Sequence, residues 1–454
     1  MAGGGKAVQT PPRGPLARKA RVSLSLNGPE GLVHRQAEAR RACDRTVVAI
    51  LLALSVVGPS AGVASLAVVA GVALFLAFNS LVRVRRAELT LQYGRTFRTA
   101  IALASVFVIA TLVNSPISDA GGQLILWAPL VCAASVFENG SDRILHKFAW
   151  ALGVVAVVQA AVAALQYLFS WPTWGGLLGS GLGPVVGVNN VLPDLDGRVI
   201  GTLAHPIVLG TVAAVAIALA FTKEFTDRRW WRVACVTAGV LALCLSGTRS
   251  ALIVLTVALI VQIFRDRSVL SGILGRFAVA LLIVLAIVSV NWRELRLISS
   301  LEGSLSLLNR LGSWRVLASV FEKSPADLFL GLGARANETL AQGGYLAAGN
   351  FTYAIDNTFV STILSGGFVA LALILYLTGC ALMNPHPIAS CLGLVSVGMM
   401  LSFDIVFWPI PTLVLLIASS RMVVPMVPLS GRTPPPEDEP SVLGQTNFRG
   451  REMT

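Results

Sequence analysis

Twelve long apolar runs are the feature that most constrains how this 454-residue chain can fold. Most contain 16 to 24 residues, close to the about 20 that an α-helix needs to cross a bilayer. Backbone groups in lipid must bond within their own segment, so such runs fold as helices. The sequence predicts an all-α polytopic membrane protein with about 12 transmembrane helices, at about 46–60, 61–82, 98–114, 122–138, 148–169, 203–222, 231–247, 249–264, 273–291, 357–380, 387–402 and 404–423.

The composition agrees with this interpretation and excludes other classes of protein. Only 13% of the residues are charged, 55% are hydrophobic, and the mean hydropathy is +0.75. A soluble globular chain carries about 25% charged residues. The low charge and the clustering of apolar residues exclude an ordinary cytoplasmic domain, a nucleic-acid-binding protein and a disordered chain.

The placement of the basic residues predicts the orientation. The net charge is +12, and with the amino terminus inside, 27 of the 35 Lys and Arg residues fall in cytoplasmic segments and 8 in outer ones. By the positive-inside rule this favours twelve spans with both termini in the cytoplasm. The count stays open at one place, because Gly58-Pro59-Ser60 alone separates the first two runs and either one or two spans precede Arg83.

The chain divides into three parts by composition. Residues 1–45 are polar and rich in Gly, Pro and Arg, and 425–454 are similar, so both are predicted to be disordered cytoplasmic tails. The transmembrane domain spans 46–424 and carries two long extracytoplasmic loops, at about 170–202 and 292–356. Loops of this length usually carry function.

The larger loop is predicted to contain a short amphipathic helix along the membrane face. Apolar residues recur there at near-helical spacing, and the helix is expected to end at Ser324-Pro325. The residues that carry this pattern are Leu311, Trp314, Ala318 and Phe321.

The apolar runs contain few ionisable residues. Ion-coupled transporters need such groups within the membrane, so this class is disfavoured, and no nucleotide-binding glycine loop is present. The six cysteines lie in or beside apolar runs without metal-ligand spacing, which favours small core residues. We therefore expect neither a metal nor a cofactor.

Four arginines on the outer side are the candidate functional residues. Arg198 precedes the sixth span, Arg249 lies in a short turn between two spans, and Arg310 and Arg315 flank Trp314 in the larger loop. The positive-inside rule disfavours arginine at these places. A planar guanidinium binds oxyanions through two hydrogen bonds, so these residues suit a diphosphate.

Each candidate also has a simpler interpretation. Arg198 and Arg315 could reach lipid headgroups, and Arg310 could be a solvated surface charge. Asp356-Asn357 opens the tenth span, where both residue types cap helices. His205, which precedes Pro206, is interpreted as a helix-start residue and not as a catalyst.

Short motifs follow one another in these regions. They are Ser246-Gly-Thr-Arg249-Ser-Ala, then Arg310-Leu-Gly-Ser-Trp314 with Pro325 and Gly331-Leu-Gly333, then Asp356-Asn357 with Gly366-Gly367. In this order they resemble the outer turn, the Arg-x3-Trp … Pro … Gly-x-Gly loop and the post-loop helix of the O-antigen ligase and polymerase superfamily. The resemblance spans about 190–375, and the many-spanned architecture extends it to most of the membrane region.

One departure from the superfamily pattern bears on the activity. Ligases of this superfamily typically have a His where this chain has Asp356, and an acidic residue is more similar to the polymerases. The resemblance therefore implies a bacterial inner-membrane glycosyltransferase that polymerises surface polysaccharide repeat units from a polyprenyl-diphosphate carrier. The alternatives are a ligase with a lipid or protein acceptor, a lipid-linked glycan flippase, and a scaffold in an assembly complex.

The resemblance also implies roles for the candidate residues. Arg249 and Arg310 would bind the diphosphate leaving group, and Asp356 would be the general base. Substrate-binding contacts would come from Arg198, Arg315, Asn357 and Trp314. The transfer would be inverting and metal-independent. The expected partners are the lipid-linked glycan donor, a glycan acceptor, the bilayer and other polysaccharide assembly proteins, and not nucleic acid.

Overall fold

The computed structural model describes residues 29–56, 62–141, 143–170, 185–186, 189, 191–192, 195, 197–265, 316, 324–342, 355 and 357–420. In this part of the chain the backbone is mostly α-helical, with a short antiparallel pair of strands, β1 (Val185–Val186) and β2 (Arg198–Val199). Six of the described helices are long and apolar enough to cross a membrane. The predicted class, an all-α membrane protein, is confirmed at this level, and the total of 12 spans stays a prediction.

Each predicted span that falls on described residues overlaps a helix, and the span predicted at 273–291 lies outside them. The bounds differ most at the first span, whose helix begins at Pro29, and at the last, whose helix covers only Pro409–Ala418. The long helices of the first half are α2 (Pro29–Val56), α3 (Gly62–Arg86), α4 (Arg95–Asn114), α5 (Ile117–Glu138) and α6 (Ile144–Phe169). The later elements are α8 (Pro206–Ala220), η2 (Lys223–Phe225), α9 (Arg229–Ser246), α10 (Arg249–Arg265), α14 (Pro325–Leu330), η3 (Gly333–Arg335), α15 (Ala336–Gln342), α16 (Thr358–Leu382), α17 (Pro387–Met400) and α18 (Pro409–Ala418).

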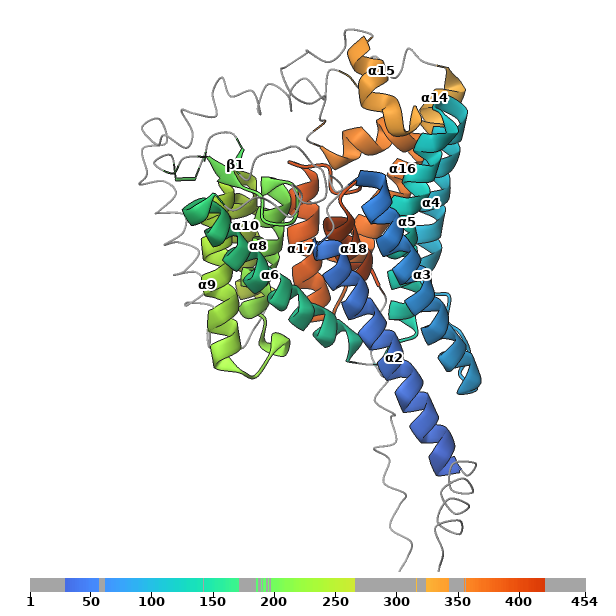
Figure 1. The fold of residues 1–454 in the computed structure, drawn as a ribbon, viewed down its shortest axis with the longest axis vertical. Coiled ribbons are helices and arrows are strands. Elements are labelled where there is room, and N and C mark those ends of the chain that lie inside the picture. The colour runs from blue at the N-terminus through green and yellow to red at the C-terminus, as the bar shows by residue number, and fades with distance from the viewer. Residues whose placement is uncertain are drawn as a thin grey trace, which may run out of the picture. The chain divides into compact units, whose positions relative to one another are not determined.

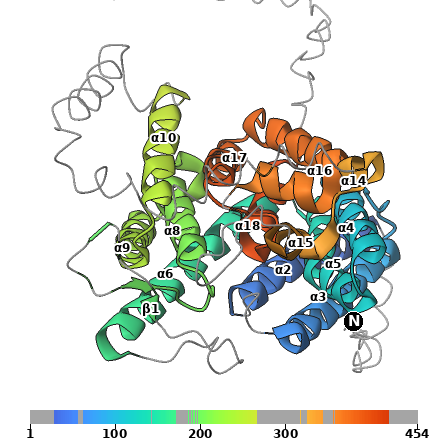
Figure 2. The same ribbon diagram turned by 90° about the horizontal axis from the view of Figure 1, so that it is seen from above.

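The helices form two groups that share a centre (Figures 1 and 2). In one group α3 and α4 pack on α5, and α2 packs on α3. In the other, α9 packs on α6 and α8, and α10 packs on α8. Between them α17 contacts α8, α10 and α16, and α18 contacts α5, α16 and α17. Helices α8, α10 and α16 begin at one end of the bundle, which we call the Arg249 end. Helices α4, α9 and α17 begin at the opposite end, which we call the Arg95 end.

The central helices are short. The lengths of α8, α17 and α18 are 15, 14 and 10 residues, or about 22, 21 and 15 Å at the usual helical rise. These lengths are below the about 30 Å of a bilayer core, and the non-helical connections 197–205 and 401–408 continue the chain toward the Arg249 end. Non-helical backbone at membrane depth is tolerated where protein buries it or a cavity adjoins it. The non-helical connections at the Arg249 end of these helices are therefore a candidate ligand-binding region.

The amino-terminal tail differs from its prediction. The predicted disordered tail 1–45 does not extend that far, because α2 already begins at Pro29. Ala39, Cys43 and Val47 recur at helical spacing and are buried, while the charged residues between them hide this pattern in the composition. The buried carboxylate of Asp44 also bonds Ser141 and pairs with Lys147. Residues 1–28 and the predicted tail 425–454 lie outside the described residues.

The larger predicted loop contributes a well-packed segment to the Arg249 end. The structure begins α14 at Pro325, where the sequence predicted a helix to end, and Ser324 caps it. Leu311, Trp314, Ala318 and Phe321, on which the predicted amphipathic helix rests, lie outside the described residues. The Asn114 amide donates to Gly331 O at 2.9 Å, and the hydroxyl of Thr111 accepts from Ala334 N at 3.1 Å. These bonds fix the segment on α4.

A bend in α16 completes this contact. Gly367 has φ 66° within the helix, a value that favours glycine. A Cβ atom at Gly367 would lie 2.2 Å from Phe329 O, and one at Gly331 would lie 2.4 Å from Gly366 N. Leu332 N also donates to Leu364 O at 2.6 Å. The two glycine motifs of the sequence thus meet, and the first part of α16, which follows Asn357, is held at a defined angle.

His386, at the Arg95 end, makes the stability of the fold sensitive to pH. It caps α17 by accepting from Ile388 N at 3.3 Å. Burial lowers the pKa of His386 below the usual 6.5, and the nearby His146 ring lowers this pKa further. The carboxylate of Glu224 acts in the opposite direction and raises it by a smaller amount. Below about pH 6.5 His386 is therefore protonated in the unfolded chain but stays neutral in the folded protein. The free energy of unfolding consequently falls as the pH drops through that value.

The measurement is the thermal unfolding midpoint of the purified protein from about pH 8 to pH 5. We expect the midpoint to fall below about pH 6.5, and to fall less in His386→Asn, whose amide oxygen keeps an acceptor for the same backbone N–H. Equal slopes in the two proteins would contradict this role of His386.

Candidate functional site

The turn between α9 and α10 holds Arg249 at the first position of α10. Gly247 ends α9 with φ 58°, the left-handed conformation that favours glycine. The amide of the buried Asn189 donates to Cys244 O at 2.9 Å. A Cβ atom at Gly247 would lie 2.7 Å from Asn189 Oδ1. The backbone that precedes Arg249 is therefore tightly constrained, and Arg249 itself is half-buried.

Arg198 contacts the same turn. Its Nε donates to Ser246 O at 2.8 Å, and a terminal nitrogen donates to Thr248 Oγ1 at 3.1 Å. The Thr248 hydroxyl in turn donates to Pro206 O at 3.1 Å. The structure thus brings together two of the predicted arginines, Arg198 and Arg249. The protein acceptors of Arg198 also disfavour a side chain that only reaches lipid headgroups.

Two buried glutamines of α6 fix the connection 197–205. Gln166 pairs with the peptide of Gly201, donating to its O at 2.9 Å and accepting from its N at 2.8 Å. Gln159 accepts from Thr202 N at 2.9 Å and donates to Ser55 O at 3.1 Å. Side chains therefore satisfy backbone groups that a helix would have satisfied internally. The sequence showed these glutamines as neutral polar residues in a span and did not predict their partner.

Loss of the Gln166 amide is expected to lower the free energy of unfolding by about 1–3 kcal/mol, because Gln166→Leu leaves buried backbone groups of Gly201 without partners. Gln262→Leu is the matched control, since the Gln262 amide is buried without a hydrogen-bond partner in the described part of the chain. That substitution should leave stability unchanged or raise it. Chemical unfolding in mixed micelles measures both, and equal effects would contradict the assignment.

His205 links this half of the site to the connection 401–408. It precedes α8 and accepts from Ile207 N through Nδ1 at 3.2 Å, so its interpretation as a helix-start residue is confirmed. Its ring also stacks on Phe403 at a centroid distance of 5.4 Å and lies 5.2 Å from the Trp408 ring. The Phe403 and Trp408 rings also contact each other at 5.5 Å, so the imidazole packs against an aromatic pair.

The connection 401–408 is bonded in turn to the start of α16. The hydroxyl of Thr358 donates to Phe403 O at 2.7 Å and accepts from Ile405 N at 3.0 Å. The Ser361 hydroxyl donates to the carboxylate of Asp404. A continuous set of contacts therefore joins the arginine turn to the first residues of α16.

Asn357 is the N-cap of α16. Its side-chain oxygen accepts from Phe359 N at 3.0 Å and Val360 N at 3.2 Å, and the residue is 3% exposed. The structure therefore confirms that Asn357 caps the helix. The cap uses the side-chain oxygen and leaves the amide nitrogen as a donor for a ligand. The other predicted site residues, Arg310, Trp314, Arg315 and Asp356, lie outside the described residues.

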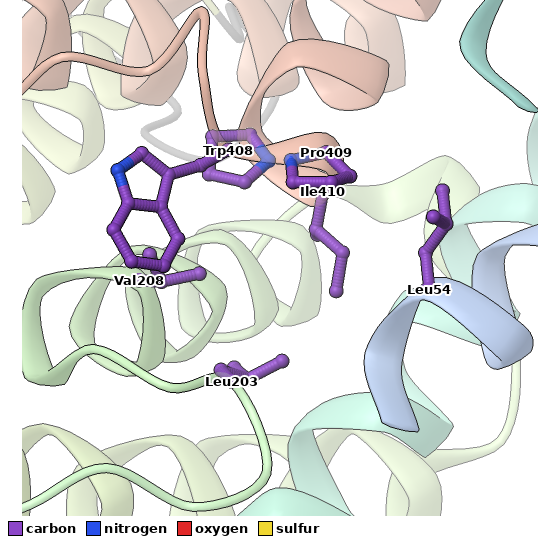
Figure 3. Close-up of a pocket in the computed structure, with 7 residues that line it drawn as sticks. Leu54, Leu203, Val208, Trp408, Pro409 and Ile410 are labelled. Carbon is purple, nitrogen blue, oxygen red and sulfur yellow. The ribbon is translucent and has the colours of Figure 1, made fainter. Parts of the chain in front are cut away.

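A small apolar cavity of about 10 Å³ adjoins Trp408 (Figure 3), which is room for about one water molecule. Trp408, which contacts His205, forms one wall, and Leu203 and Leu54 lie across from the start of α18. The complete lining is Leu54, Leu203, Val208, Trp408, Pro409, Ile410 and Pro411. The site therefore offers guanidinium groups for oxyanions, and the cavity is too small to hold an apolar group of a ligand.

Sequence reasoning missed the residues that build this framework. Asn189, Thr248 and Ser361 act through backbone or side-chain hydrogen bonds to neighbours distant in sequence. A signal existed for Gln159 and Gln166, since residues seven positions apart share a helix face. Among the described residues no group of three or more His, Cys, Asp and Glu side chains is placed to hold a metal ion.

Comparison with known proteins identifies no relative, so the function is argued from the residues of this chain. No protein-family profile matches the chain, and no curated protein matches it. What the molecule offers is an α-helical membrane scaffold in which Arg198 contacts the turn that precedes Arg249, with a stacked histidine at the same end. This combination suits an amphiphile that carries an oxyanion.

Proposed function

We propose that this chain is a membrane glycosyltransferase that joins glycan repeat units carried on a polyprenyl diphosphate. The Arg249 end would face the outside of a bacterial cytoplasmic membrane. The ordered motifs from Ser246-Gly-Thr-Arg249 to Asp356-Asn357, which resemble the O-antigen ligase and polymerase superfamily, support the proposal. The apolar helices suit a lipid-linked substrate.

The observation that carries the proposal is the contact of Arg198 with the turn that precedes Arg249. Arg198 bonds Ser246 O and Thr248 Oγ1, the residues immediately before Arg249. Outside the cell no nucleotide triphosphate drives the reaction, so the diphosphate leaving group must be stabilised by the protein. Guanidinium groups held in advance at the developing charge are an effective way to do this.

The reaction would be a direct displacement at the anomeric carbon of the donor. The hydroxyl oxygen of the acceptor sugar forms the new glycosidic bond while the bond from carbon to the diphosphate oxygen breaks. Asp356 takes the hydroxyl proton as general base, and the electron pair leaves with the diphosphate, to which Arg249 and Arg310 bind. Arg198, Arg315, Asn357 and Trp314 complete the substrate contacts, and the configuration inverts.

Within this class we favour polymerisation of repeat units. Asp356 is acidic where ligases of the superfamily typically have His, and this departure is more similar to polymerases. A ligase that moves the finished glycan to a lipid or protein acceptor is the nearest alternative.

The test is the length distribution of lipid-linked and surface glycan in cells with and without the gene. Loss of the gene should collapse the ladder to single repeat units at the outer leaflet. Full-length chains that stay on the carrier would instead identify a ligase. Repeat units trapped at the inner leaflet would identify a flippase and overturn the catalytic assignments together.

A further inference from the structure

His205 has a second polar atom that its structural roles do not use. Nδ1 accepts the N–H of Ile207, so the neutral ring carries its proton on Nε2. Phe403 stacks on the ring, and Trp408 packs against it at a tilt. Among the described residues none accepts a hydrogen bond from Nε2. This atom is not one of the buried polar atoms that lack a partner, so its N–H is accessible to a ligand.

The position of His205 points to the chemistry of that ligand. The hydroxyl of Thr248 accepts from the Arg198 guanidinium at 3.1 Å and donates to Pro206 O at 3.1 Å. One hydroxyl therefore joins Arg198 to the residue that follows His205, and the charge of Arg198 acts on the imidazole. A neutral N–H beside a guanidinium complements an oxyanion, since both groups donate to it.

We propose that His205 is a ligand-binding residue whose Nε2–H donates a hydrogen bond to a phosphate oxygen of the diphosphate bound at Arg198 and Arg249. This inference rests on the proposed function and deepens it by naming a third donor, one without charge. The aromatic stack fixes the direction of the donor before the ligand arrives, which lowers the entropic cost of binding.

Two substitutions separate the two nitrogens of the ring. The amide of Asn places a polar atom near the position of Nδ1, and that of Gln near the position of Nε2. His205→Asn keeps an acceptor for Ile207 N and loses the distal donor. His205→Gln keeps the distal donor and loses the cap, so its unfolding midpoint should fall. If His205 has a purely structural role, His205→Gln should be the more impaired variant. If it has a binding role, His205→Asn should bind the ligand more weakly than His205→Gln.

The experiment measures the dissociation constant of farnesyl diphosphate for the full chain in nanodiscs, with farnesol as the control for apolar binding. We expect His205→Asn to bind about 10- to 150-fold more weakly, as for the loss of a hydrogen bond to a charged group, with an unchanged unfolding midpoint. His205→Gln should bind within a few-fold of the original protein while its midpoint falls.

Each other outcome overturns the inference. If His205→Asn binds as tightly as the original protein while Arg249→Ala does not, His205 is not a donor, and the proposed function stands. If the affinities of both variants follow their unfolding midpoints, the role of His205 is structural. If the original protein binds farnesyl diphosphate no better than farnesol, the proposed function itself fails.

Discussion

Replacement of Arg249 by alanine is expected to lower the rate of glycan transfer by about 10³- to 10⁵-fold, the range for an arginine that stabilises leaving-group charge in the transition state. The turn that precedes Arg249 is held by Arg198 and by Asn189, so the backbone should keep its conformation in the variant. The loss should therefore come from the missing guanidinium. Polymer output per inserted protein molecule, measured in cells that lack the original gene, gives the ratio.

Two further variants show whether the effect belongs to this position. Arg229 is the first residue of α9, as Arg249 is of α10, and it is exposed at the Arg95 end. Arg229→Ala should leave polymer output unchanged. Arg249→Lys keeps the charge without the planar fork and should give an intermediate rate. An inserted Arg249→Ala protein with near-normal output would refute the assignment.

The second large effect is expected at the bend of α16. Gly367→Ala places a side chain at φ 66° and ψ −167°, a region almost exclusive to glycine, which costs about 1–3 kcal/mol. Its Cβ atom would also lie 2.2 Å from Phe329 O, and such overpacking adds about 1–3 kcal/mol. The strain should separate the segment 324–335 from α16 and displace Asn357. We expect a lower unfolding midpoint and faster proteolysis of the 324–335 segment.

Gly379 in the same helix is the matched control. A Cβ atom there would have no heavy atom within 4 Å, and alanine is a better helix former than glycine by about 1 kcal/mol. Gly379→Ala should therefore be neutral or stabilising. If the two substitutions were equally well tolerated, the close contact between Gly367 and Phe329 would not exist in the protein.

The helices could be predicted from the sequence because membrane length and hydropathy are local properties. The start of α2 could not, since the buried stripe through Ala39 and Cys43 lies among arginines that dominate the local composition. The short length of α18 was also hidden, because the residues 405–408 before it, Ile-Val-Phe-Trp, are as apolar as the helix. Hydropathy measures burial and does not distinguish helical from non-helical backbone.

The candidate site was predictable only in part for the same reason. Arg198 and Arg249 stood out because they are charged residues at unfavourable places, and the structure brings Arg198 into contact with the turn that precedes Arg249. The contact of Gly331 with Gly366 joins residues 35 positions apart, and no pairing rule within one sequence predicts it. Asn357 shows a further limit, since one residue type serves equally as a helix cap and as a ligand contact.

The pairing of Gln166 with the peptide of Gly201 has a consequence for how this chain could diverge in evolution. The backbone at Gly201 and Thr202 is held by side chains of another helix, so the neighbouring residues Val199, Ile200 and Leu203 are free to drift as long as they stay apolar. The constraint instead falls on two glutamines seven residues apart and on Gly201, whose Cβ atom would lie 2.5 Å from Gln159 Oε1. Distant relatives should therefore share this scattered set of positions while the connecting sequence diverges beyond recognition.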